Sequence, residues 1–111
     1  MTKISNINLT VELDEKNMPS KIEWEATDSN FKGKKECKAM MLSLWDKEDD
    51  STLGIDLWTK DMLINEMNIF FLQTLKKMAD TYLRSTSNND ISKFIREFSD
   101  QFAEKIEEIK K

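Results

Sequence analysis

Few side chains in this chain of 111 residues can do chemistry, and the most versatile one is missing, because the sequence contains no histidine. Histidine is the usual general acid or base near neutral pH and the commonest metal ligand. The single cysteine, Cys37, has no imidazole to activate it, although Lys35 and Lys38 are expected to lower its pKa slightly. Ser43 and Ser85 likewise have no base partner for serine hydrolase chemistry. We therefore expect a protein that is not an enzyme.

The spacing of the acidic residues fits neither a calcium loop nor a pair of catalytic carboxylates. An EF-hand loop beginning at Asp46 would place Ser51 and Leu57 where that loop needs a glycine and a bidentate glutamate. Glu23 and Glu25 share one strand face, whereas glycosidase carboxylates face each other across a cleft. The sequence also has no glycine-rich phosphate loop. It therefore predicts no catalytic, cofactor-binding or metal-binding residue.

The net charge and the composition argue against some classes of binding partner. The net charge is −4 and neither half of the chain is basic, which argues against nucleic acid or an anionic membrane surface. A basic cluster around Gly33 is either a solvated loop or an anion contact, and it contains Lys32, Lys34, Lys35 and Lys38. No run approaches the roughly 20 apolar residues of a membrane span, and residues 1–9 lack the pattern of a secretory signal. A lone thiol fits a reducing compartment, so we expect a cytoplasmic location.

Hydrophobic periodicity predicts the elements that position these residues. Alternation of apolar and polar residues predicts strands, and apolar residues three and four apart predict helices. The aromatic residues of the helices, which include Phe94 and Phe98, are expected to form a core against the sheet. The order ββββαα indicates one α+β domain over residues 1–111, a four-stranded antiparallel sheet followed by two helices packed on one face. The strands are expected over 7–13, 22–26, 36–45 and 53–59, and the helices over 65–82, capped by Asp61 or Asn65, and 90–109, capped by Asn89 or Asp90.

The third and fourth strands are apolar on both faces, although two helices can cover only one face of a sheet. The uncovered side chains are the candidates for an interface: Met40, Leu42, Leu44 and Trp58. Three explanations stay open at this point. A bulge or the N-terminal segment buries the second face, the face mediates self-association, or it binds a partner or client protein.

Several runs of the sequence match a pattern of small bacterial proteins: LDEKNMP at 13–19, IEWEATD at 22–28, KAMMLSLWD at 38–46, IDLWTKDM at 55–62, and EM at 66–67 with FFLQTL at 70–75. These runs resemble the GldC family of gliding motility-associated proteins. The similarity covers nearly the whole chain, and its most specific piece is LWTKDM. Leu63 and Asn65 depart from the pattern, where proline and aspartate are expected.

The resemblance implies a cytoplasmic accessory protein of the gliding machinery of Bacteroidetes, with no enzymatic activity and no cofactor. Together with the apolar strands, it leads us to expect a homo-oligomer that also binds a protein of the gliding or export machinery. The order of elements, the acidic charge and the apolar sheet face are similar to those of the export chaperone SecB. A chaperone-like holdase for extended protein clients is therefore the alternative function, although fold similarity alone does not fix function.

Overall fold

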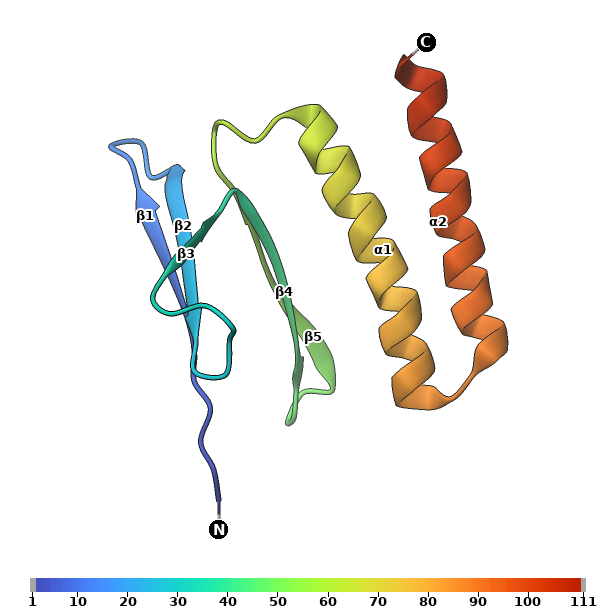
Figure 1. Ribbon diagram of the computed structural model, residues 1–111, viewed down its shortest axis with the longest axis horizontal. Coiled ribbons are helices and arrows are strands. Elements are labelled where there is room, and N and C mark those ends of the chain that lie inside the picture. The colour runs from blue at the N-terminus through green and yellow to red at the C-terminus, as the bar shows by residue number, and fades with distance from the viewer. Residues whose placement is uncertain (1, 111) are drawn as a thin grey trace. The chain divides into compact units, whose positions relative to one another are not determined.

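The computed structural model describes residues 2–110, and the chain folds as two compact units that divide between Met62 and Leu63 (Figure 1). The first unit holds the strands and the second holds two helices, which confirms the α+β class. A single domain over residues 1–111, and helices packed on a sheet face, stay predictions. The elements are β1 (Ile7–Leu13), β2 (Pro19–Ala26), β3 (Lys35–Cys37), β4 (Ala39–Asp46), β5 (Ser51–Trp58), α1 (Ile64–Thr86) and α2 (Asn89–Lys110).

The β1–β2 hairpin follows the predicted alternation. Val11 lies opposite Ile22 on one face, and Thr10 lies opposite Glu23 on the other. The first face is apolar and contains the fully buried Ile22, whereas the second presents polar side chains. This is the pattern expected of an antiparallel sheet with one face covered and one face solvated.

The prediction of one four-stranded sheet is wrong, because the strands form a three-stranded sheet, β1-β2-β3, and a two-stranded sheet, β4-β5. The strand expected over 36–45 is interrupted by a bend at Lys38, so β3 pairs with β2 while β4 pairs with β5. Continuing the β2–β3 register would place Lys38 opposite Lys21 and Met40 opposite Pro19, which has no N–H to donate. Like-charge repulsion and a lost ladder hydrogen bond therefore favour the change of partner.

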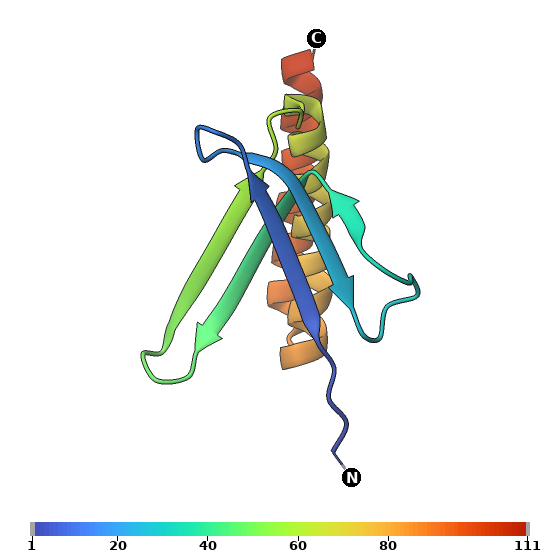
Figure 2. The ribbon, with the colours of Figure 1, turned by 90° about the vertical axis from the view of Figure 1, so that its left-hand side faces the viewer.

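The two sheets of the first unit are joined beside this bend. The backbone N–H of the buried Thr59 donates to the carbonyl of Lys38 at 2.8 Å, just beyond the last β4–β5 pair. The ammonium group of Lys60 forms an ion pair with Asp14, in the turn between β1 and β2. The two sheets lie close together at this end and diverge toward the β4–β5 turn (Figure 2).

The start of α1 differs from the prediction. The expected caps were Asp61 or Asn65, but Leu63 occupies the N-cap position and its side chain makes no capping hydrogen bond. The backbone N–H of Leu63 instead donates to the carboxylate of Glu66 at 2.9 Å. This is the second half of a capping box, in which an acidic side chain reaches back to the N-cap backbone.

The turn between the helices is built from short polar residues. Ser87 ends α1 in the left-handed region, with φ of 60°, and its N–H donates to the carbonyl of Leu83 at 2.8 Å. Asn88, one residue before the expected caps of α2, accepts the backbone N–H of Ile91 at 3.1 Å. Asn88 therefore satisfies one of the otherwise unpaired N–H groups at the start of α2.

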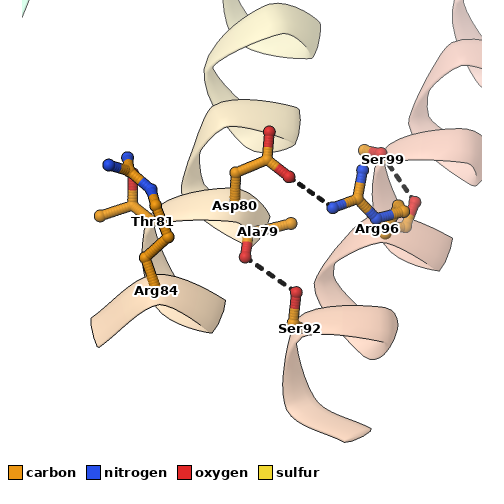
Figure 3. Close-up of polar contacts among 7 residues, drawn as sticks. All are labelled: Ala79, Asp80, Thr81, Arg84, Ser92, Arg96 and Ser99. Atoms are coloured by element: carbon orange, nitrogen blue, oxygen red, sulfur yellow. Dashed lines mark hydrogen bonds and ion pairs between the residues drawn. The ribbon is translucent and has the colours of Figure 1, made fainter. Parts of the chain in front are cut away.

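The two helices pack along a seam of small residues, shown in Figure 3. Ala79 and Ser99 are fully buried, and the hydroxyl of the nearly buried Ser92 donates to the carbonyl of Ala79 at 2.8 Å. Beside the seam, Arg96 donates to the carboxylate of Asp80 at 2.5 Å. Small side chains at these positions allow the two helix backbones to approach closely, and larger side chains on the same stripes, such as Leu75, Ile95 and Phe102, are partly buried.

Candidate interaction surface

The β4–β5 hairpin carries all four interface candidates, but its register divides them between two faces. Leu44 lies opposite Leu53, Leu42 opposite Ile55, and Met40 opposite Leu57, so these side chains project from one face. Trp58 lies opposite Ala39 and projects from the other face. We name the first set the aliphatic face, and it consists of Met40, Leu42, Leu44, Leu53, Ile55 and Leu57.

The aliphatic face is apolar along its length, yet much of it is accessible. Leu44, Leu53 and Ile55 are each more than half exposed, and the other three side chains are partly buried. A two-stranded hairpin on its own is only marginally stable in water, since it has too little neighbouring surface to pack against. The aliphatic face is therefore a candidate contact surface.

The opposite face of the hairpin is mixed. Trp58 and Trp45 are 56% and 65% exposed, and both rings have the amphipathic character found at binding hot spots. Between them, however, the strands contribute the polar side chains of Ser43 and Asp56 to this face. A dry interface would require desolvation of Asp56, so this face is the weaker candidate.

The basic loop predicted around Gly33 is ordered by aromatic contacts. Gly33 has φ of 81°, a conformation that glycine adopts without steric strain. The ring of Phe31 packs edge-on against Trp24, with 6.4 Å between the ring centroids. The ammonium group of Lys35 lies 3.7 Å from the centroid of the Phe31 ring, a cation–π contact. Lys35 therefore helps to fold the loop, whereas an anion contact of this cluster stays a prediction.

A thiol, a lysine and two carboxylates line a recess at the junction of the two sheets of the first unit. Burial raises the pKa of the Cys37 thiol, and this effect outweighs the lowering by a backbone hydrogen bond from Ala39. The hydroxyl of Thr59 donates to Asp61 at 2.5 Å and lowers the pKa of that carboxyl. The recess thus offers a protonated thiol and a carboxylate that already accepts a hydrogen bond, which together provide no activated nucleophile. Its lining includes Ser20, Glu36, Cys37, Lys38, Thr59 and Asp61.

The most strongly shifted carboxyl serves the fold. Its ion pair with Lys60, followed by a hydrogen bond from the backbone N–H of Met18, lowers the pKa of Asp14 to about 2. The Met18 N–H lies 3.0 Å from the carboxylate, and the N–H of Lys16 lies 2.8 Å from it. These bonds hold the turn after β1, where Asn17 has φ of 61°.

The described residues form neither a metal-binding cluster nor a membrane-spanning helix. In residues 2–110, no three cysteine, aspartate or glutamate side chains converge in a way that could hold a metal ion. In the same part of the chain, neither helix has an apolar stretch long enough to cross a membrane.

The pairing of the two aliphatic rows of the β4–β5 hairpin was not predicted from the sequence. Leu53, Ile55 and Leu57 were recognised as one face of a strand, but they were not matched with Met40, Leu42 and Leu44. The missing signal was the turn, because residues 47–50 form a four-residue loop and loop length fixes the register of a hairpin. Counting outward from this loop would have paired the two aliphatic rows and placed Trp58 on the other face.

Comparison with known proteins agrees with the resemblance seen in the sequence. No curated protein sequence and no solved structure matches the chain. Residues 19–108 match the family described as gliding motility-associated protein GldC-like. The match spans β2 to α2 and thus includes strands of both sheets and both helices. The chain therefore belongs to the GldC-like family of gliding motility-associated proteins.

Proposed function

We propose that this protein is a non-enzymatic, cytoplasmic accessory protein of bacterial gliding motility that acts by self-association and by binding a protein of the gliding or export machinery. Family membership supports the role in motility. The observation that carries self-association is the aliphatic face, where Leu44, Leu53 and Ile55 are exposed without a polar side chain among them.

The size of this face is appropriate for protein contact. At about 180 Å² for a fully exposed leucine or isoleucine, these three half-exposed residues alone present about 300 Å² of apolar surface, within the range of functional patches on soluble proteins. A second copy of the hairpin offers the same apolar surface, and a twofold axis would place the two aliphatic faces against each other.

The raised pKa of the thiol and the hydrogen bonds of two carboxylates support a protein without catalytic activity. The sequence has no histidine, the thiol of Cys37 has a raised pKa, and the carboxylates of Asp14 and Asp61 are committed to hydrogen bonds within the first unit. The recess beside Cys37 gathers polar groups, but neither its thiol nor the Asp61 carboxylate is activated for attack.

The substitution Leu44→Glu tests self-association, because it places a carboxylate in the aliphatic face. Ser43→Glu is the matched control, since the neighbouring side chain projects from the opposite face of β4. Light scattering coupled to size exclusion should show a lower mass for Leu44→Glu than for the wild type, with Ser43→Glu unchanged. Circular dichroism checks that both variants are folded. An unchanged mass for Leu44→Glu would refute the aliphatic face as the interface.

The same pair of variants tests the role in motility when each replaces the native copy in a gliding bacterium. We expect Leu44→Glu to reduce colony spreading at equal protein level, and Ser43→Glu to leave spreading unchanged. The chaperone alternative gives a different result, because a holdase suppresses the aggregation of several unrelated unfolded proteins. Such general suppression by the wild type would favour the holdase over a dedicated accessory protein.

A further inference from the structure

We propose that the α1–α2 hairpin docks onto the same hairpin of a second copy of this chain, which completes a four-helix bundle across a twofold axis. This inference rests on the proposed function, because it adds a second surface to the proposed self-association. We name this surface the helical apolar face, and it consists of Ile64, Phe71 and Met78 from α1 with Ile91, Phe94 and Phe98 from α2.

The hairpin has two unlike sides, which the ion pair between Asp80 and Arg96 identifies. Met78 precedes Asp80 by two residues, and Phe98 follows Arg96 by two residues. Two residues of an α-helix turn the side-chain direction by about 200°. Since Asp80 and Arg96 meet on one side of the hairpin (Figure 3), Met78 and Phe98 project from the opposite side.

The side chains of the helical apolar face lie beside the centre of the helix–helix contact. Ala79, Ser92 and Ser99 are buried at that centre, and Arg96 meets Asp80 on the other side of the hairpin. Phe94 and Phe98 are 72% and 53% exposed. Each helix therefore carries a row of large apolar residues that are partly exposed.

The area of the helical apolar face is close to what a stable dimer requires. Its six residues are between 41% and 82% exposed. At about 190 Å² for a fully exposed large apolar residue, they present about 650 Å² together. A standard interface buries about 800 Å² on each partner, so this face with its rim fills one side of such an interface.

The spacing of the residues indicates that the occupant is helical. Ile64, Phe71 and Met78 are seven residues apart, as are Ile91 and Phe98. A seven-residue repeat produces a straight apolar seam that packs against another helix, the arrangement of coiled coils and four-helix bundles. A second copy of this chain presents the same two seams, and the twofold arrangement makes both sides of the contact equivalent.

The experiment measures the mass of four proteins by light scattering coupled to size exclusion, over a series of protein concentrations. Phe94→Glu places a charge in the helical apolar face, and Lys93→Glu adds the same side chain at the neighbouring position on the polar side. Leu44→Glu removes the aliphatic face separately. Because a chain with two different twofold interfaces assembles beyond a dimer, we expect a wild type larger than a dimer, and dimers of Phe94→Glu and of Leu44→Glu. Lys93→Glu should keep the wild-type mass.

The outcomes separate this inference from the proposed function. If Phe94→Glu keeps the wild-type mass, the helical contact is refuted, and the proposed self-association stands when Leu44→Glu lowers the mass. If only Phe94→Glu lowers the mass, the helical contact stands and the aliphatic face is refuted. A monomeric wild type overturns both the helical contact and self-association through the aliphatic face. If the wild type is monomeric and Phe94→Glu also has a lower melting temperature, the helical apolar face makes a contact within one chain. An increase in the dissociation constant of at least about 30-fold is expected for Phe94→Glu, as for a central aromatic anchor.

Discussion

Ile22 provides the sharpest test of the packing in the first unit. It lies on the central strand of the three-stranded sheet, opposite Val11 on β1 and Cys37 on β3, and it is fully buried. Ile22→Ala removes three carbon atoms from a buried site, and such changes cost about 2–5 kcal/mol of the free energy of unfolding. Ile22→Val removes one methyl group and should cost about 0.5–1.5 kcal/mol. Ile7→Ala is the control, because Ile7 is 73% exposed and should change stability by about 0.5 kcal/mol or less.

The assay uses the distribution of chromophores between the units. All three tryptophans, Trp24, Trp45 and Trp58, belong to the first unit, whereas the helices that dominate the circular dichroism belong to the second. Urea unfolding at one fixed protein concentration, followed by fluorescence, therefore reports the strands. We expect the fluorescence midpoint to fall in the order wild type, Ile22→Val, Ile22→Ala. A fall in the circular dichroism midpoint by the same amount would show that the units unfold as one domain. If Ile22→Ala and Ile7→Ala cost the same, the packing described for Ile22 is wrong.

Two further predictions concern pH and helix capping. Since the pKa of Asp14 is about 2 in the folded chain against an ordinary value of 3.8, its carboxylate stabilises the fold above about pH 4, and this contribution is lost as the pH falls toward 2. Urea midpoints measured across that range should fall more for the wild type than for Asp14→Asn, and parallel curves would contradict the ion pair with Lys60. Asn88→Ala removes the acceptor for the Ile91 N–H and should cost about 1 kcal/mol by thermal unfolding, with Asn88→Asp as the conservative control. Equal stability of the alanine and aspartate variants would show that this cap contributes nothing.

The local elements could be predicted from the sequence because their patterns depend on near neighbours. The alternation from Ile7 to Leu13 gives β1 with its observed bounds, and the change to a helical period marks α1 and α2. The exchange of partners at Lys38 could not be predicted in this way. Periodicity shows which side chains share a face, but the choice between β2 and β5 as a neighbour depends on contacts between distant residues, such as the repulsion between Lys21 and Lys38.

The candidate interaction surface was predicted only in part, because the sequence shows which side chains share a face of one strand but not how two strands pair. Met40, Leu42 and Leu44 share a face as expected, whereas Trp58 does not join them, because its side depends on the hairpin register. The apolar rows of the helices were visible as a stripe, but a stripe does not specify what covers it. Phe94 was assigned to contact with the sheet of its own chain, and that assignment stays a prediction.

The raised pKa of Cys37 has a practical consequence for spectroscopy. A thiol that holds its proton at neutral pH reacts slowly with maleimide dyes, since the thiolate is the attacking species. A cysteine placed on an exposed helical position such as Gln73 should therefore take up a fluorophore well before the native thiol does. Selective labelling of the wild-type background, without first replacing Cys37, would allow the assembly of labelled chains to be followed by energy transfer.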